Sequence, residues 1–371
     1  MQRIIHTPEG VRDIYNGECM QKHQLQEKLL KVFHRYGYEE IETPTFEYFE
    51  VFSQEVGTIP SKDLYKFFDR EGNTLVLRPD FTPSVSRACA TYFSPDREVV
   101  NLCYTGNTFI NNSSFRGCLK ENTQMGVERI GDESPEGDGE ILAMTVECCL
   151  EAGLKEFQVS IGQVDYFKSL LKEAGLDQEG EERLRSLISQ KNYFGVDELV
   201  REWGLKESLA NAFRELPQLF GPVEVLDKAR SLTDNPCALQ AVSRLQEIYD
   251  ILKLYGYEKY ITFDFGMLSK YNYYTGIIFQ AYTYGTGEPL VKGGRYNELL
   301  RHFGKPAASI GFAIVVDTLL LALSRQNIEL PGDQERQIIF YTSKNRDEAI
   351  KKAQELRAQG KCVALRPGKE E

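Results

Sequence analysis

Strand-like segments lie on both sides of a long helical stretch in this 371-residue chain. From about residue 166 to residue 255 charged helices dominate, with leucine at helical spacing, as at 239–254. Strand patterns come before this stretch, at 99–104 and 123–130, and return after it, at 274–282. We therefore expect an α+β fold in which antiparallel strands carry a helical insertion.

The end of the chain is expected to form a small unit of its own. Residues 331–333 read Pro-Gly-Asp, which is typical of a linker, and a strand–helix–strand pattern follows. We expect a main domain over 1–325, with the insertion at about 166–255, and a partial C-terminal α/β unit over 332–371. A doubly wound nucleotide-binding fold is disfavoured, because no G-x-G-x-x-G follows an early strand and no G-x-x-x-x-G-K-[ST] occurs.

Composition and charge exclude several classes of function. No apolar run is long enough to span a membrane and the N-terminus has no apolar signal core, so we expect a cytoplasmic protein without a membrane partner. The eight cysteines form no Cys-x-x-Cys and only four histidines are present, so we expect no metal site and no cofactor. A net charge of −11 argues against a nucleic-acid partner, whose phosphates require clustered Lys and Arg.

Three short clusters contain the side chains suited to binding a small cation. Asp80 and Thr82 directly follow a predicted strand, and Gln124 and Glu128 are an even number of residues apart, so that a strand points both to one face. A tyrosine pair, 273–274, precedes a Thr-Gly turn. Carboxylates, an amide and phenols suit an ammonium or an imidazole. Taken one at a time, each is equally compatible with an ordinary strand-end or surface residue, and spacing alone does not join the clusters.

Several longer segments, in this order, resemble histidyl-tRNA synthetases. They are 7–13, 37–44 (class II motif 1), 104–128 (motif 2), 266–276 (the histidine-binding segment) and 293–323 (motif 3). The resemblance spans roughly residues 1–325. It implies a class II aminoacyl-tRNA synthetase-like antiparallel sheet flanked by helices, and a dimer that forms through residues 37–44.

The same resemblance implies a histidine-binding pocket. Its residues are Asp80, Thr82, Gln124, Glu128, Tyr273 and Tyr274. The first three would hold the α-amino group, Glu128 and Tyr273 would hold the imidazole, and Tyr274 would line the cavity. An acidic acceptor suits an ammonium group, and a carboxylate–phenol pair suits the ring nitrogens.

The chain departs from the synthetases at the positions that bind ATP. Motif 2 of the family reads Phe-Arg-x-Glu, whereas Ile110 and Asn112 stand here, and Thr318 replaces the motif 3 arginine. Amino-acid activation requires cations on the phosphates, and removing one such donor typically costs about 3 kcal/mol of transition-state stabilisation. We therefore expect no adenylation and no catalytic residue in this chain.

Two further departures concern the ligand carboxylate and tRNA. Ser269 stands where the histidine segment of the enzymes has an arginine, and Lys270 or Lys120 are the candidates to replace that cation. After Pro331 the chain has room for one strand–helix–strand unit rather than a complete anticodon-binding domain, so we expect no tRNA partner unless the chain is cut short.

A synthetase-like chain without these features resembles the regulatory subunits of ATP phosphoribosyltransferase. That resemblance implies a non-catalytic protein that assembles with the short-form catalytic subunit, is required for the first step of histidine biosynthesis and mediates feedback inhibition by free histidine, its effector. Two alternatives stay open at this point. The first is an active histidine–tRNA ligase with an unusual site, and the second is an amino-acid-binding scaffold for another partner.

Overall fold

The computed structural model describes residues 6–52, 59–95, 98–112, 119–268, 274–330 and 337–369. The chain divides into two compact units. The larger comprises Met1–Asp13 and Gln26–Ile328, and the smaller comprises Ile14–Leu25 and Glu329–Glu371.

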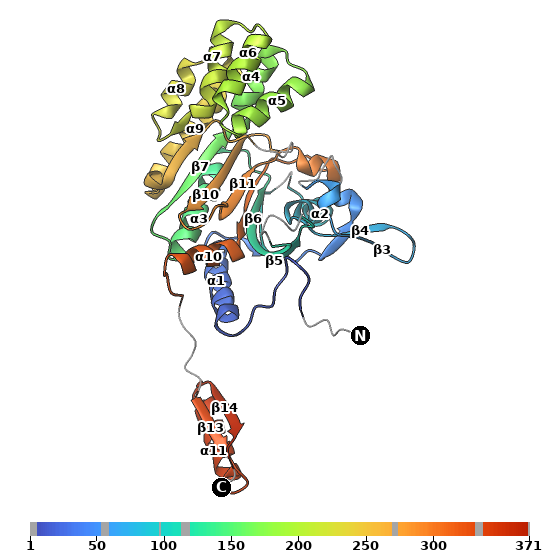
Figure 1. Cartoon of the computed structure of the whole chain (residues 1–371), viewed down its shortest axis with the longest axis vertical. Coiled ribbons are helices and arrows are strands. Elements are labelled where there is room, and N and C mark those ends of the chain that lie inside the picture. The colour runs from blue at the N-terminus through green and yellow to red at the C-terminus, as the bar shows by residue number, and fades with distance from the viewer. Residues whose placement is uncertain are drawn as a thin grey trace. The chain divides into compact units, whose positions relative to one another are not determined.

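The larger unit is built on a nine-stranded sheet with the order β1-β5-β6-β12-β11-β10-β7-β9-β8 (Figure 1). The strands are β1 Glu39–Glu40, β5 Val100–Phe109, β6 Glu121–Ile130, β7 Phe157–Gln163, β8 Phe220–Gly221, β9 Ile261–Asp264, β10 Ile277–Thr283, β11 Val291–Arg295 and β12 Ser309–Val315. The β1–β5 and β7–β9 pairs are parallel, and the other neighbours are antiparallel. The expected α+β fold is confirmed.

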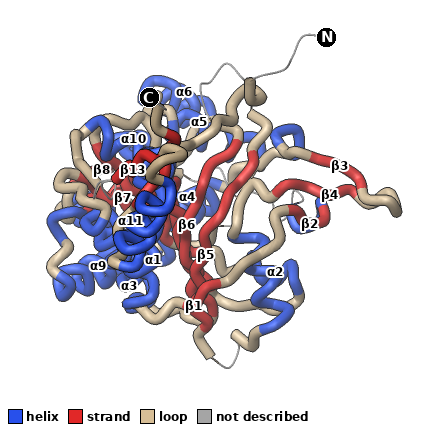
Figure 2. Tube along the Cα trace, turned by 90° about the horizontal axis from the view of Figure 1, so that it is seen from below, coloured by secondary structure: helices blue, strands red, loops and turns tan. Residues whose placement is uncertain are grey.

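The long hairpin of β5 and β6 forms the centre of the site described below. Its register runs from Val100 opposite Ile130 to Phe109 opposite Glu121, and the two strands lie side by side in Figure 2. The two antiparallel strands predicted at 99–104 and 123–130 are thus confirmed, and both are longer than predicted. A smaller three-stranded sheet has the order β2-β4-β3, with β2 Phe46–Tyr48, β3 Lys66–Phe68 and β4 Thr74–Leu77.

Helices cover both faces of the large sheet. On one face lie α3 Pro135–Glu151, α10 Val316–Arg325 and the part of α1 (Asn16–Arg35) that belongs to the larger unit, where the ring of Phe33 meets Phe312 of β12 edge-on at 6.0 Å. On the other face α2, Thr82–Tyr92, packs through Val85 and Cys89 against Leu102 of β5. The start of α3 is well specified, because Ser134 caps the amide of Gly137 and Pro135 occupies the first turn.

Six helices lie together beyond β7 in the larger unit (Figure 1). They are α4 Val164–Ala174, α5 Gln178–Ser189, α6 Tyr193–Glu202, α7 Glu207–Glu215, α8 Val225–Ser231 and α9 Pro236–Tyr255. Strand β8 lies among them in sequence and pairs with β9, which the sequence did not indicate. These helices occupy the stretch expected to be an insertion, and its boundaries at 166 and 255 stay a prediction.

The smaller unit contains β13 Gln337–Tyr341, α11 Arg346–Ala358 and β14 Val363–Pro367. The two strands pair in parallel, which requires a crossover, and α11 supplies it. The limits 1–325 and 332–371 of the two expected domains also stay a prediction. No described helix is both long and apolar enough to cross a membrane.

Candidate functional site

A cavity of about 130 Å³ opens on the face of β6, β12 and β11 that α2 covers in part. It brings together five of the predicted ligand-binding residues, from three segments of the chain. They are Asp80, Thr82, Gln124, Glu128 and Tyr274. The sixth, Tyr273, lies outside the described residues, as do Ser269 and Lys270. The geometry joins the three clusters that spacing alone left separate, and their role in binding histidine stays a proposal.

Strand alternation explains how β6 contributes two of these groups. Gln124 and Glu128 are four residues apart and so project from the same face, opposite Val315 and Gly311 of β12. The Oε1 atom of Gln124 is buried and accepts no hydrogen bond from the described residues. A buried acceptor without a donor is costly, so this oxygen is suited to an N–H group of a ligand.

Glu128 is the more enclosed of the two acidic residues that line the cavity, with 1% of its surface exposed. The Thr82 hydroxyl donates to its Oε1 at 2.7 Å, and the Tyr296 hydroxyl donates to its Oε2. Burial raises the pKa of Glu128 to about 8, a shift that the two hydroxyl donors partly offset and the nearby Asp80 reinforces. A cation or an imidazole placed against this carboxyl group would favour its ionised form.

Glycine makes room for Glu128. A Cβ atom on Gly311 would overlap Glu128 Oε2 and the backbone carbonyl oxygen of Val127. On β11, a Cβ atom on Gly294 would lie 2.6 Å from Cε1 of Tyr274. Glycine is therefore required at 311 to accommodate Glu128 and at 294 to accommodate Tyr274.

Replacing Gly311 with alanine is expected to reduce stability by about 1–3 kcal/mol, as overpacking of a filled interior does. The added methyl group must displace both the carboxylate of Glu128 and a rigid backbone oxygen. Urea denaturation of the variant measures the loss. Gly287→Ala is the matched control, because a Cβ atom there meets nothing within 4 Å. Equal midpoints for the two variants would contradict the expected crowding.

Arg78, two residues before Asp80, does not line the cavity. Its guanidinium donates to the carbonyl oxygens of Asn107 and Thr43, each at 2.8 Å, and lies 4.0 Å from the ring centroid of Phe81. This arginine follows β4 and binds backbone carbonyls of β5 and of the segment before β2, so its role is structural.

The positions that bind ATP in the synthetases have no positive charge here. Ile110 lines the cavity and Asn112 is half-buried. Thr318 lies in the first turn of α10, next to Asp317, whose Oδ2 accepts the Thr123 amide at 2.7 Å. Lys120, one candidate for the missing carboxylate-binding cation, does not line the cavity, and its stem packs against Gly10.

Sequence reasoning missed two cavity residues, both on or next to β11. Tyr296 holds Glu128, and Lys292 is the one positively charged residue among the described residues that line the cavity. Both are an even number of positions from Gly294, so the alternation of an identified strand was the signal that could have found them.

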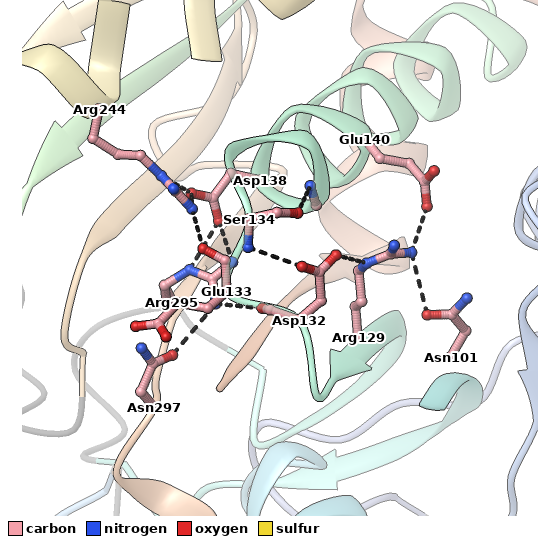
Figure 3. Close-up of polar contacts among 11 residues, drawn as sticks. Asn101, Arg129, Asp132, Glu133, Ser134, Asp138, Glu140, Arg244, Arg295 and Asn297 are labelled. Carbon is pink, nitrogen blue, oxygen red and sulfur yellow. Dashed lines mark hydrogen bonds and ion pairs between the residues drawn. The ribbon is translucent and has the colours of Figure 1, made fainter. Parts of the chain in front are cut away.

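An ion network that includes one arginine from β6 and one from β11 lies on the opposite face of these strands from the cavity (Figure 3). Because neighbours in a strand point to opposite faces, Arg129 and Arg295 project away from the cavity that Glu128 and Tyr296 line. Arg295 Nη2 contacts Asp138 Oδ1 at 2.6 Å, and Arg244 Nε contacts Asp138 Oδ2 at 2.8 Å. Asp138 is 1% exposed. The network therefore fixes the ends of β6 and β11, next to the cavity residues Glu128 and Tyr296.

The segment that carries Tyr274 is held from both sides. The Thr275 amide donates to the carbonyl of Arg295 at 2.9 Å, and the Thr275 hydroxyl accepts the Asn297 amide at 2.9 Å. From the helical stretch, Lys168 Nζ donates to the Tyr274 carbonyl at 3.1 Å. The position of Tyr274 therefore depends on α4 as well as on β11.

Comparison with known proteins agrees with this architecture. The histidyl-tRNA synthetase family matches residues 10–319. The ATP phosphoribosyltransferase regulatory subunit of Acetivibrio thermocellus is 40% identical over 361 residues, which cover 97% of this chain and 86% of that protein.

Solved structures give the same result. A structure from Bacillus halodurans, described as an ATP phosphoribosyltransferase regulatory subunit/histidyl-tRNA synthetase, matches with a TM-score of 0.88 and 33% identity, covering 99% of this chain and 94% of that one. Histidyl-tRNA synthetase from Nostoc, at 19% identity and a TM-score of 0.81 (100% and 88% covered), shares the fold. The predicted class II synthetase-like fold is confirmed, and the chain belongs to the ATP phosphoribosyltransferase regulatory subunit family of histidyl-tRNA synthetase-like proteins.

Proposed function

We propose that this chain is a non-catalytic subunit that regulates ATP phosphoribosyltransferase in histidine biosynthesis, with free histidine as its effector. The observation that carries the proposal is a cavity that keeps the acidic and amide groups for an amino acid but has Ile110 at a position where the synthetases bind ATP with a charged side chain. The names of the relatives support the regulatory role. The chain performs no chemistry of its own under this proposal and requires no cofactor, metal or tRNA.

The cavity has a group for each cationic part of histidine. The α-amino group lies against Asp80 and the unpaired Oε1 atom of Gln124, and Thr82 stands beside them. The imidazole lies against Glu128, whose carboxyl group is buried and oriented by two hydroxyl donors. Tyr274 forms a wall, and the family resemblance adds Tyr273. A charge-assisted pair with a buried carboxylate is the strongest interaction that this cavity offers.

Regulation follows from linkage between the effector and the assembled complex. A ligand shifts a conformational equilibrium only by its differential affinity for the two states, and such coupling is typically about 1–3 kcal/mol. Histidine bound in the cavity would favour the arrangement in which the short-form catalytic subunit is inactive. The same coupling makes catalytic-subunit assembly weaken or strengthen histidine binding by an equal factor.

Reconstitution tests the proposal directly. The purified chain is added to a short-form catalytic subunit, and phosphoribosyl-ATP formation is followed with and without histidine. We expect activity to require this chain and to fall when histidine is added. A catalytic subunit that works equally well alone, or a complex indifferent to histidine, would contradict the proposal.

Glu128→Gln is expected to weaken histidine binding by about 10- to 100-fold, the effect of losing a hydrogen bond to a charged group. The amide keeps the volume of the carboxyl group but not its charge. Calorimetric titration of the full chain measures the change, and Glu288→Gln, in the exposed turn before β11, is the matched control. A flat titration of the parent chain would remove the effector role, and unchanged affinity in Glu128→Gln would remove the assigned cavity.

An active histidine–tRNA ligase is the second candidate, because the fold and the family match are those of that enzyme. Its discriminating activity is histidine-dependent exchange of pyrophosphate into ATP. The uncharged Ile110 and Thr318 lead us to expect none. An amino-acid-binding scaffold for another partner is separated by the same reconstitution, which it would fail while still binding histidine.

Self-association through residues 37–44 is part of the proposal. β1, within this segment, lies at the edge of the large sheet beside β5, and the neighbouring three-stranded sheet exposes Phe46, Tyr48 and Phe68. Exposed aromatic clusters of this kind mark association surfaces. Sedimentation of the parent chain and of Phe46→Ser with Phe68→Ser tests whether this edge makes the dimer.

A further inference from the structure

We infer that Lys292 is the cation that binds the carboxylate of the amino-acid ligand, in place of the arginine that the synthetases carry in their histidine segment. The inference rests on the proposed function, since it assigns one more contact within the same cavity. Of the two lysines that sequence alone made candidates, Lys120 does not line the cavity and Lys270 lies outside the described residues.

The register of the sheet places Lys292 on the ligand side. Lys292 of β11 lies opposite Ala313 of β12, and Ala313 lies opposite Gly126 of β6. Directly opposed residues project from the same face, so Lys292 shares the face of Gly126 and therefore of Gln124 and Glu128, two residues to either side. Two strand spacings separate Lys292 from Gly126, roughly 10 Å.

The residue next to Lys292 across the sheet is small. Lys292 lies opposite Ala313, which has only a methyl group, and the next residue along the row is Gly126, over which the phenol of Tyr104 lies. Lys292, Ala313, Glu128 and Tyr296 line the same cavity. A four-carbon stem lets the ammonium reach over Ala313.

The distribution of charge in the cavity supports a contact between Lys292 and the ligand carboxylate. Among the described lining residues are two carboxylates, Asp80 and Glu128, and one cation, Lys292. Lys292 is exposed and makes no ion pair or hydrogen bond with a described residue, while its neighbours Val291 and Gly293 are buried. An amino acid brings one carboxylate for which Asp80 and Glu128 are unsuitable, and Lys292 is positioned to accept it. The ordinary alternative is a solvated lysine on an open sheet face.

Two ligands that differ only at the carboxylate distinguish a lysine that binds the ligand from a solvated one. The full chain is titrated calorimetrically with L-histidine and with L-histidinol, in which a hydroxymethyl group replaces the carboxylate. The parent, Lys292→Met and Lys292→Arg are compared, and thermal unfolding checks that all three fold alike, as expected at an exposed position. The parent is expected to prefer histidine by about 10- to 100-fold. Lys292→Met is expected to lose that preference through weaker histidine binding alone, and Lys292→Arg to retain it.

Each other outcome is decisive. A Lys292→Met variant that still prefers histidine as the parent does, or that weakens both ligands equally, overturns the role of Lys292 and leaves the cavity assignment intact. A parent that binds histidine without preferring it overturns the carboxylate contact in the same way. A parent that binds neither ligand overturns the proposed function, and the inference with it.

Discussion

Replacing Arg295 with methionine is expected to lower the free energy of unfolding by about 3–5 kcal/mol, the usual cost of removing one partner from a buried ion pair. Arg295 is 5% exposed and Asp138 is 1% exposed. Without Arg295, the carboxylate of Asp138 keeps only Arg244, and the carbonyl of Asp132 loses the donor that Arg295 Nη1 provides at 2.8 Å. The charge that remains buried, rather than the lost attraction itself, causes most of the loss.

Urea denaturation at neutral pH measures this difference. Arg301→Met is the matched control, because Arg301 pairs with Glu298 on the surface, where 67% and 51% of the two side chains are exposed. Exposed pairs are worth about 0–1 kcal/mol. A loss at Arg295 no larger than that at Arg301 would mean that the network in Figure 3 does not stabilise the sheet.

Stability of the ligand-free chain is expected to fall as the pH rises from about 4.5 to about 8, through Glu128. The carboxyl group has a pKa of 4.5 when unfolded and of about 8 when folded, because burial penalises its ionised form. Below pH 4.5 both states hold the proton, so the full stability is present. Between the two values the unfolded state releases the proton and the folded state keeps it, so unfolding is favoured progressively. Each unit of pKa difference corresponds to about 1.4 kcal/mol.

The contribution of Glu128 is isolated by comparing two chains. The free energy of unfolding is measured from pH 4.5 to 8.5 for the parent and for Glu128→Gln, which has no proton to release. The difference between the two curves is expected to shift steadily in favour of the variant as the pH rises. A difference that is independent of pH would show that Glu128 is ionised in the folded chain throughout this range.

Local patterns predicted the fold class and the central hairpin well. The alternation in 123–130 placed Gln124 and Glu128 on one face, and the leucine spacing in 239–254 predicted α9. Both rest on interactions between near neighbours in the chain. Strand β8 was missed because two residues carry no periodicity, and its pairing with β9 joins segments about forty residues apart.

Some residues of the candidate site could likewise be predicted from the sequence, and some of its contacts could not. Asp80 and Glu128 were singled out from predicted strands and assigned to one pocket by resemblance to a known family, and the cavity brings them together. The contact between Tyr296 and Glu128 joins residues 168 positions apart, and that between Arg295 and Asp138 joins residues 157 apart. Such pairs depend on strand register across the whole sheet, which no local pattern contains.

The hydrogen bond from Lys168 of α4 to the Tyr274 carbonyl connects the helical stretch to a residue that lines the cavity. A protein that docks on these helices and displaces α4 would lengthen or break this hydrogen bond and so remove one of the contacts that hold Tyr274. A molecule seated against Tyr274 in turn resists the displacement. This hydrogen bond offers one route by which contact on the helices and binding in the cavity influence each other.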